Sequence, residues 1–553
     1  MSTQAERKTP RSARPARTTA CALLILVLVS CGGGTDPSAA AKKKLRFAMP
    51  GEPQTLDPAL MTGLSEINLA TDLFEGLMRF DPKGGDPLPG VAETFEVSPD
   101  ALVYTFHLRK CAWSDGSPLT ARDFVTSWRR VLEPVTASKY AGQLYCIEGA
   151  RAFNAGEEKD FSKVMIEAVD DATLKVRLHA PTPHFPFLVA SPVYAPVHAA
   201  TVEKFKDRWT LPENIVSNGP FVLKEHRLNS VIRLERNPRY WDTAAVKLDT
   251  IEAMPVEHDE TAFSMYEVGD LDWLRTIPFS KVERVSQRVD FCCTQALETV
   301  FLRLNVSTPP FDDPRVRKAF AAGTDQEAIC AKLLKSGQQP ARCFVPPVLW
   351  RPASAPGEEQ GASTPDLATP CKGIGFDPSE AKRLLKEAGY PEGHGFPEVT
   401  LIYSTSENIR LVVELLQWQW KQNLGVRVSL VNMERKAYFE AMKERRYNLA
   451  YSSWVGDYPD PQTFLDVFRS DSGTNRTGWS NAEYDRLVTA AGVELDKEKR
   501  RALFAQAERL LVEDECPAVM LYFGSNSFLL NKKVKGVSPN ALGLYPLRDA
   551  ALE

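Results

Sequence analysis

The chain has 553 residues, of which 43% are hydrophobic and 25% are charged, as is ordinary for a soluble globular protein. That length exceeds what one hydrophobic core supports, so we expect two or three subdomains. The formal net charge is −4, and the basic residues among the first thirty positions leave the remainder more acidic still. This balance argues against a protein that binds nucleic acid or an anionic membrane surface through a basic patch.

The N-terminus has the pattern of a secretory signal peptide. A basic stretch, Arg7 to Arg17, precedes a short apolar run that ends at Val29. This run is about ten residues long, whereas a bilayer span needs roughly twenty. Residues 28–31, Leu-Val-Ser-Cys, resemble the bacterial lipobox, so we expect a signal peptide over 1–30, lipidation of Cys31 and a flexible tether over 31–44. The alternative is an ordinary signal peptide with an incidental cysteine.

Strands and helices then follow one another. Leu45 to Met49 begin an extended segment, and the alternation of Tyr104, Phe106 and Leu108 is typical of a half-buried strand. Further strands are expected over 174–178 and 231–234. Thr120, with Asp123 three residues later, predicts the start of a helix. One face of that helix is apolar: Ala121, Phe124, Val125, Trp128, Val131 and Leu132.

The second half continues in the same way. Asp313-Pro314 and Asp377-Pro378 each place a capping residue before a proline that suits the first helical turn. Glu380 would complete a capping box in the second helix, and Gly389 would end it. The Pro-, Gly- and Ser-rich stretch 350–372 is expected to be a surface loop. Strands and helices mixed throughout predict an α/β fold.

Eight cysteines remain after Cys21 and Cys31: Cys111, Cys146, Cys292, Cys293, Cys330, Cys343, Cys371 and Cys516. Cys343 and Cys371 flank the 350–372 loop, so a disulfide between them is expected. The pairing of the others stays open, because eight cysteines allow 105 full pairings. Neither these cysteines nor the seven scattered histidines have the spacing of a metal site, so we expect no metal and no cofactor.

Known catalytic signatures are also missing from the sequence. It contains no G-x-S-x-G elbow, no phosphate-binding G-x-x-x-x-G-K-[ST] loop and no G-x-G-x-x-G. Asp457 and Asp460 could be taken for the carboxylate pair of a hydrolase, but three residues apart in a proline-containing loop they carry little specificity. We therefore predict that the protein is not an enzyme, and we expect Asp460 to be a solvated loop residue.

Several ordered segments resemble one family. They are 69–80 (LATDLFEGLMRF), 89–93 (PGVAE), 104–109 (YTFHLR), 113–116 (WSDG), 136–141 (TASKYA), 214–221 (NIVSNGPF), 234–242 (LERNPRYWD), 310–319 (PFDDPRVRKA) and 454–461 (WVGDYPDP). In order and spacing they resemble the periplasmic oligopeptide-binding proteins of the large extracellular solute-binding family, family 5, from about residue 45 to residue 550. The resemblance implies a two-lobed periplasmic-binding-protein fold with a hinge and an extra inserted domain, whose lobes close over the ligand.

The resemblance also implies domain boundaries. Lobe I would comprise 45–74, 199–297 and 525–553. Domain II would comprise 75–198, and lobe III would comprise 298–524. Each lobe would then have a core of its own, which accords with the subdomain count expected from chain length.

A protein that carries many different peptides must hold what all peptides share. An extended peptide can add to a sheet as a strand, and a carboxylate can hold its α-ammonium by a charge-assisted bond. In the family that carboxylate is the aspartate of a Trp-x-x-Asp-Tyr motif, here Trp454 to Tyr458, so the resemblance implies that Asp457 has this role; the alternative is that Asp457 only caps a turn. The remaining predicted ligand-binding residues are Trp454, Tyr140, Ser453, Val455, Leu64, Tyr266 and Tyr522, with strand-like bonds expected from the backbone of Ser453 and Val455.

The chain departs from the family at three places. Many relatives carry an arginine for the peptide carboxylate where this chain has Tyr451, and a ligand-stacking tryptophan where it has Arg435. A cysteine of a family disulfide is replaced by Val455. The resemblance thus implies that recognition of the amine is retained, while it leaves open how the peptide's C-terminus and its length are recognised.

The resulting prediction is a monomeric extracytoplasmic lipoprotein that captures short peptides and delivers them to the permease and ATPase subunits of an ABC importer. It would lie in the periplasm or cell envelope and touch the membrane only through its lipid anchor. Alternatives are the same fold with a nickel chelate, haem or an oligosaccharide as ligand, and a peptide-holding chaperone or receptor without transport. A ligand that lacks a cation would leave Asp457 desolvated and unpaired, which is costly.

Overall fold

The computed structural model describes residues 42–82, 85–350, 371–537 and 539–553. Its largest element is an 11-stranded mixed sheet with the order β10-β11-β12-β1-β13-β19-β14-β18-β16-β17, in which β15 also pairs with β19. The strands are β1 (Lys44–Met49), β10 (Phe221–Arg227), β11 (Val231–Arg236), β12 (Thr250–Pro255), β13 (Trp273–Leu274), β14 (Phe291–Leu304), β15 (Gln339–Pro340), β16 (Val399–Ser404), β17 (Val428–Met433), β18 (Leu449–Val455) and β19 (Ala518–Leu530).

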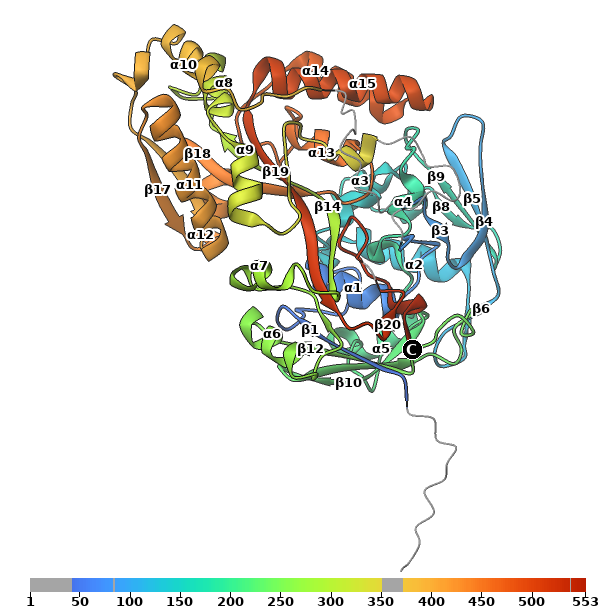
Figure 1. Cartoon of the computed structure of the whole chain (residues 1–553). Helices are drawn as coiled ribbons and strands as arrows, with labels where there is room; N and C mark the ends of the chain where they lie inside the picture. The colour runs from blue at the N-terminus through green and yellow to red at the C-terminus, as the bar shows by residue number, and fades with distance from the viewer. Residues whose placement is uncertain (1–41, 83–84, 351–370, 538) are drawn as a thin grey trace, which may run out of the picture. The chain divides into compact units, whose positions relative to one another are not determined.

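Two long antiparallel strands, β14 and β19, join the two halves of this sheet (Figure 1). β13 pairs with the last residues of β19, Leu529 and Leu530. β18 pairs with the last seven residues of β14, from Glu298 to Leu304. Between these two pairings the register of β14 against β19 shifts, between Gln295 and Thr299. Such irregularities bend a strand, and this one lies where the sheet passes from one half to the other.

A separate four-stranded antiparallel sheet has the order β4 (Ala92–Val97), β5 (Val103–Leu108), β9 (Thr173–Arg177) and β8 (Ile166–Ala168). The predicted helix beside it is α2 (Ala121–Leu132), and the Thr120–Asp123 capping box is confirmed. Phe124 and Trp128 on its apolar face are fully buried, and the indole of Trp128 donates to the carbonyl of Tyr194 at 2.7 Å. The strands predicted over 45–49, 104–108, 174–178 and 231–234 are confirmed within one or two residues.

Helices of the second half start where the proline patterns place them. The carboxylate of Asp313 accepts from the backbone of Arg315 at the start of α8 (Pro314–Ala322), and Asp377 caps α10 (Pro378–Glu387) in the same way. Gly389 follows with φ of 97°, a left-handed conformation that favours glycine. The expected capping box of α10 is wrong, because the carboxylate of Glu380 pairs with the guanidinium of Arg383 one turn along the helix.

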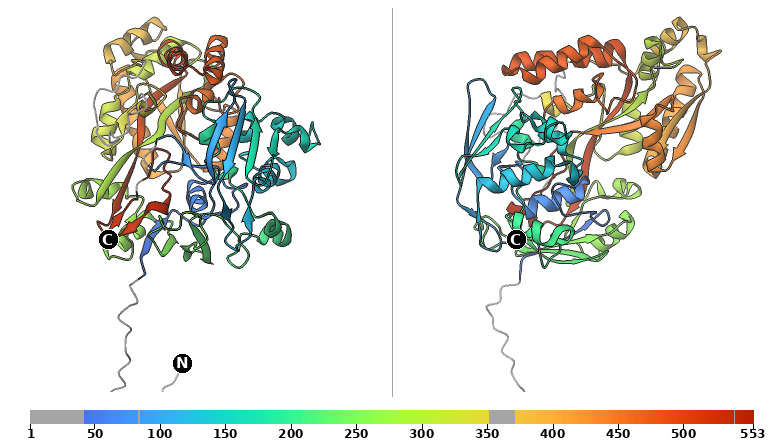
Figure 2. Two further views of the ribbon diagram at one scale, coloured as in Figure 1. Left: turned by 90° about the vertical axis from the view of Figure 1, so that its right-hand side faces the viewer. Right: turned by 180° about the vertical axis from the view of Figure 1, so that it is seen from behind.

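Other helices lie along the chain as follows: α1 (Leu64–Leu73), α3 (Ala150–Asn154), α4 (Phe185–Leu188), α5 (Ala199–Phe205), α6 (Asp259–Glu267), α7 (Val282–Val285), α9 (Gln326–Ala328), α11 (Glu407–Leu424), α12 (Arg435–Lys443), α13 (Gln462–Leu465), α14 (Ala482–Val493) and α15 (Lys497–Arg509). Short strand pairs are β2 (Met78–Arg79) with β3 (Leu88–Pro89), β6 (Cys111–Ala112) with β7 (Pro118–Leu119), and β20 (Val534–Lys535) with β21 (Ala551–Leu552). α14 and α15 pack against each other, as the views in Figure 2 show. Among the described residues, none of the helices is both long and apolar enough to span a bilayer.

The predicted disulfide between Cys343 and Cys371 is confirmed. The other six cysteines of the described residues form no disulfide. Most of the predicted 350–372 loop, 351–370, and the predicted signal peptide, Cys31 and tether as far as residue 41, lie outside the described residues.

Candidate functional site

A cavity of about 410 Å³ lies at the end of β18. Its walls come from segments far apart in the sequence, so only the folded chain assembles it. The lining residues are Pro58, Met61, Thr62, Leu64 and Ile67 around the start of α1; Phe80, Tyr140, Gln143, Ser191, Pro192 and Val193; Trp454, Val455, Gly456 and Asp457 at the end of β18; and Leu542 and Leu544.

β18 carries a free edge beside this cavity. β16 pairs only with Leu449 and Ala450 of β18, so among the described residues no strand lies along the remainder of that edge. On the other edge, the N–H of Gly456 donates to the carbonyl of Leu297 in β14, at 2.8 Å. Because hydrogen-bonded and non-hydrogen-bonded pairs alternate in an antiparallel ladder, the backbone groups of Val455 and Ser453 point away from β14.

The free edge has a defined length. Tyr451 also faces outward by the same alternation, but its carbonyl already accepts a hydrogen bond from the hydroxyl of Tyr438 on α12. The edge open to another chain therefore comprises Ser453 and Val455, and both residues are exposed. An extended peptide could bind here through main-chain hydrogen bonds, as in other cases of strand addition.

Asp457 follows this edge directly. Its backbone N–H donates to the hydroxyl of Thr463 at 3.1 Å, which fixes the turn after β18. Asp457 is exposed within the cavity. The protein atoms around its carboxyl group nevertheless desolvate it in part and raise its pKa to about 6, although hydrogen bonding with Thr463 opposes the shift. None of the ion pairs formed by the described residues includes Asp457, so this carboxylate has no cationic partner within that part of the chain.

Two aromatic side chains lie next to Asp457. Tyr140 is half-buried, and burial together with the nearby charge of Asp457 raises the pKa of its hydroxyl. Trp454 lines the cavity, and its buried indole N–H has no hydrogen-bond partner among the described residues. Tyr458 stacks on His184 with ring centroids 4.4 Å apart, so the segment after β18 contacts the 184–193 segment that supplies part of the wall.

The cavity thus brings together five of the predicted residues, Asp457, Trp454, Val455, Tyr140 and Leu64, and Ser453 lies on the adjoining edge. Phe80, Leu542 and Leu544 were not predicted, because nothing local in the sequence relates them to β18. Thr463 was missed as well, although a hydroxyl six residues after an aspartate in a turn is a weak local signal.

Tyr266 and Tyr522 do not line the cavity. Tyr266 is buried on α6, and its hydroxyl donates to Asp290 at 2.9 Å. Tyr522 is buried in β19, with its hydroxyl 2.6 Å from that of Tyr451. Both were placed at the ligand by resemblance alone, and each satisfies its hydroxyl within the protein.

The expectation for Asp460 is wrong. Its carboxylate accepts two bonds from the guanidinium of Arg500, at 2.6 and 2.9 Å, and both side chains are only 12% exposed. It also accepts from the backbone of Gln462. Asp460 therefore ties the loop after β18 to α15, and its substitution is no neutral control for Asp457.

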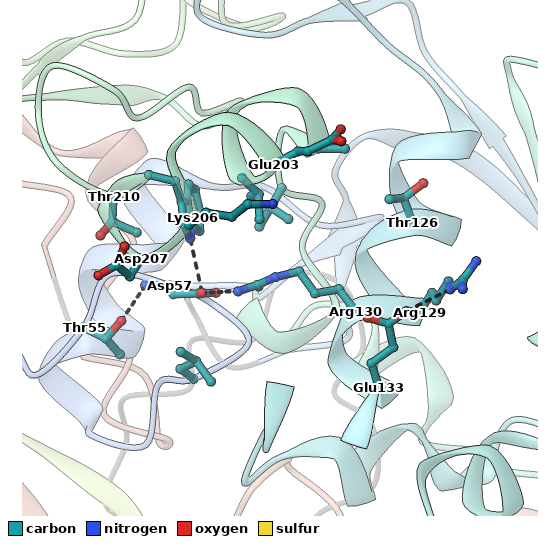
Figure 3. Close-up of a pocket in the computed structure, with 15 residues that line it drawn as sticks. Thr55, Asp57, Thr126, Arg129, Arg130, Glu133, Glu203, Lys206, Asp207 and Thr210 are labelled. Atoms are coloured by element: carbon teal, nitrogen blue, oxygen red, sulfur yellow. Dashed lines mark hydrogen bonds and ion pairs between the residues drawn. The ribbon is translucent and has the colours of Figure 1, made fainter. Parts of the chain in front are cut away.

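A larger hollow of about 860 Å³ lies between the segment before α1, helix α2 and the 197–210 segment (Figure 3). At its centre the guanidinium of Arg130 holds both carboxylate oxygens of Asp57, at 2.9 and 2.5 Å. The indole of Trp209 also donates to Asp57, at 3.3 Å. The central acid of this hollow is thus already paired, which distinguishes it from Asp457.

One group of side chains in the described residues lies close enough to hold a metal: Cys343, Cys371 and Glu508. The two cysteines are joined in the disulfide, so neither offers the thiolate that a metal needs. One carboxylate oxygen of Glu508 accepts from the backbone of Phe344 and Val345. This arrangement therefore has a structural role: the disulfide joins Cys343 to Cys371, and Glu508 holds the backbone at Phe344 and Val345.

Known proteins resemble this chain over almost its whole length. Residues 86–476 match the bacterial extracellular solute-binding proteins, family 5. The dipeptide-binding protein DppE of Bacillus subtilis is 34% identical over 522 residues, 94% of each chain. The periplasmic oligopeptide-binding protein OppA of Escherichia coli is 35% identical over 491 residues, 88% of each chain. A crystal structure of a periplasmic oligopeptide-binding protein from Borrelia burgdorferi superposes with a TM-score of 0.77 at 32% identity, covering 93% of this chain and 100% of that one.

The matched part of the chain contains the β18 edge, Asp457 and Tyr140, and the structural match extends to both halves of the large sheet. The chain therefore belongs to the bacterial extracellular solute-binding proteins, family 5, and has their two-lobed α/β fold with a hinge and an inserted domain.

Proposed function

We propose that this protein binds short peptides outside the cytoplasm and delivers them to the permease and ATPase subunits of an ABC importer. The observation that carries the proposal is the free edge at Ser453 and Val455 next to the unpaired carboxylate of Asp457. An edge supplies main-chain bonds to any extended peptide, and a carboxylate at its end supplies a partner for the α-ammonium. The names of the relatives, dipeptide- and oligopeptide-binding proteins, support the same ligand class.

The direction of the peptide follows from this geometry. Asp457 comes after β18, and the free edge runs back from it toward Tyr451. A peptide whose amino end is held at Asp457 therefore runs antiparallel to β18. The apolar wall of the cavity, including Leu64 and Phe80, would cover the first residues of the peptide and exclude water from the ion pair. Exclusion of water strengthens such a pair.

Calorimetry with four protein–peptide combinations tests the role of Asp457. We expect Asp457→Asn to weaken the binding of a free-amine peptide by about 2–5 kcal/mol, roughly thirtyfold to several-thousandfold, because the ammonium is left buried and unpaired. The N-acetylated peptide already lacks the charge, so it should bind the wild type poorly and lose little more in the variant.

The exposed Asp514 lies at the end of the helical segment after α15, away from the cavity lining, and Asp514→Asn provides a matched control that should bind both peptides as the wild type does. Equal losses for the free and acetylated peptides would contradict the assignment, because Asp457 would then shape the loop without contacting the amine. A haem, oligosaccharide or metal-chelate ligand is the alternative, and failure of every free-amine peptide to bind the wild type would favour it.

The proposed architecture assigns 45–74, 199–297 and 525–553 to lobe I, 75–198 to domain II and 298–524 to lobe III. In this division the cavity receives side chains from all three parts, and β14 and β19 cross between the lobes. Ligand contacts with both lobes would favour a closed form over an open one. A peptide-holding chaperone or receptor would bind peptide in the same way. Loss of peptide uptake on deletion of the gene would distinguish an importer component from a chaperone or a receptor.

The proposal includes a lipid anchor at Cys31, preceded by a signal peptide over 1–30 and followed by a tether over 31–44. Two or three acyl chains suffice for stable membrane attachment, whereas one chain is marginal. We expect Cys31→Ser to release the protein from washed membranes of its native host without a change in peptide affinity. A wild-type protein found free of acyl chains would contradict the anchor and leave the peptide site untouched.

A further inference from the structure

Glu298 is a second carboxylate without a cationic partner, one strand away from the free edge. It lies in β14 directly opposite Val455 of β18. By the alternation described above this is a non-hydrogen-bonded pair, in which the two side chains lie on the same face and close together. Ser453, two residues before Val455, presents its side chain on this same face. Glu298 therefore belongs to one face of the free edge.

The surroundings of Glu298 hold the carboxylate in place but do not neutralise it. Burial raises its pKa, and hydrogen bonding with the side chain of Ser453 opposes that shift. Gly524 of β19 lies beneath it, and a Cβ added there would come within 2.5 Å of Oε2 of Glu298. Because glycine has no side chain, the carboxylate of Glu298 can occupy the space that a Cβ at position 524 would fill. Among the described residues no ion pair includes Glu298.

The neighbouring groups on this face are neutral. The hydroxyls of Tyr451 and Tyr522 lie 2.6 Å apart, and burial raises the pKa of both, with a smaller contribution from the charge of Glu298. Hydroxyl groups can share hydrogen bonds with a carboxylate, but they do not compensate its charge. Desolvating a carboxylate without a positive partner is unfavourable, so a cation from outside would stabilise the ionised form of Glu298.

A bound peptide strand would bring such a cation within reach. Strands of a sheet lie about 4.8 Å apart, so a peptide on the free edge of β18 would lie about 10 Å from β14. An extended lysine or arginine side chain and the side chain of Glu298 together span this distance, whereas alanine does not. Side chains alternate between the two faces of a strand, so only every second residue of the peptide could reach Glu298.

We propose that Glu298 forms a subsite for a lysine or arginine side chain of the peptide, at positions of a single parity counted from the amino end. The inference rests on the proposed function, because it requires a peptide strand along β18. It names the substrate class more narrowly: peptides with a free amine and a basic residue on the Glu298 face. It also gives a role to the carboxylate of Glu298, which takes no part in the proposed recognition of the amine by Asp457.

A lysine scan tests this subsite. In a five-residue alanine peptide with a free terminal amine, lysine replaces alanine at each of positions 2 to 5 in turn. The matched peptide carries Nε-acetyl-lysine at the same position, which keeps the length of the side chain and removes its charge. Calorimetry at pH 8 should show lysine binding tighter than acetyl-lysine by about tenfold to a hundredfold at alternate positions only. In Glu298→Gln this difference should vanish, and in Asp514→Asn it should remain.

Gly524→Ala provides a second variant that keeps the charge. Its added Cβ displaces the carboxylate of Glu298, so the preference for lysine should fall while the alanine peptide still binds. A scan in which lysine has no advantage at any position, or an advantage that persists in Glu298→Gln, would overturn the subsite while leaving peptide binding established. Failure of the alanine peptide itself to bind the wild type would instead overturn the proposed function, and the subsite with it.

Discussion

Asp57 in the larger hollow and Asp457 in the smaller one differ in how the charge of the carboxylate is satisfied. In the larger hollow Asp57 is bound by Arg130 and by the indole of Trp209, and it is only 4% exposed. In the smaller one the backbone N–H of Asp457 donates to a hydroxyl group, and no cation of the described residues pairs with its carboxylate. A carboxylate that finds its partner within the chain stabilises the fold, whereas one that lacks a partner is free to select a ligand.

The largest expected effect lies at the paired site. Arg130→Met keeps the length of the side chain but leaves Asp57 buried without its cation, so we expect the free energy of unfolding to fall by about 3–5 kcal/mol. Denaturant titration measures this, and peptide affinity at Asp457 should not change. The neighbouring Arg129 makes only an exposed pair with Glu133, so Arg129→Met should cost about 0.5 kcal/mol or less. Similar losses in the two variants would remove the distinction between the hollows.

Asp460 lies only three residues from Asp457, yet its carboxylate is paired with an arginine, as that of Asp57 is. Asp460→Asn removes the charge that holds Arg500, and we expect a loss of about 1.5–3 kcal/mol in the free energy of unfolding. Calorimetry with a free-amine peptide under folding conditions should show an affinity close to that of the wild type. A large loss of affinity with unchanged stability would mean that Asp460, too, serves the ligand.

The smallest predicted effect is the pH dependence of binding. The pKa of Asp457 is about 6 without ligand, and an ammonium stabilises only the ionised form. Below pH 6 the carboxyl must therefore lose a proton to bind, so affinity for a free-amine peptide should fall by up to about tenfold per pH unit between pH 6 and pH 5. The peptide amine stays protonated throughout this range.

Asp457→Asn controls for other groups that titrate in this range, among them Asp466, whose pKa burial also raises to about 6. The variant should show a flat profile between pH 7 and pH 5. A wild-type profile that is equally flat would mean that Asp457 does not meet the amine. A variant that keeps the full slope would assign the titration to another carboxyl group.

Short-range patterns in the sequence determined much of this structure. Helix starts at Thr120, Asp313 and Asp377 depend on bonds to backbone groups two or three residues away, and alternating residues such as Tyr104 and Phe106 mark a strand wherever it pairs. The disulfide across the 350–372 loop was predictable because its cysteines flank one segment. Asp457 was found because ordered motifs along the whole chain resemble one family.

Long-range packing decided the rest. Asp460 and Arg500 lie 40 residues apart, and Glu298 and Val455 lie on strands whose register no local pattern fixes. The partners of Tyr266 and Tyr522 likewise became known only when helix and strand were packed, because an aromatic hydroxyl is equally suited to a ligand or to a buried acceptor. Whether a given carboxylate is paired or free depends on which side chains meet in three dimensions. For this reason the sequence named Asp457, but only the tertiary structure distinguished it from the paired Asp57 and Asp460.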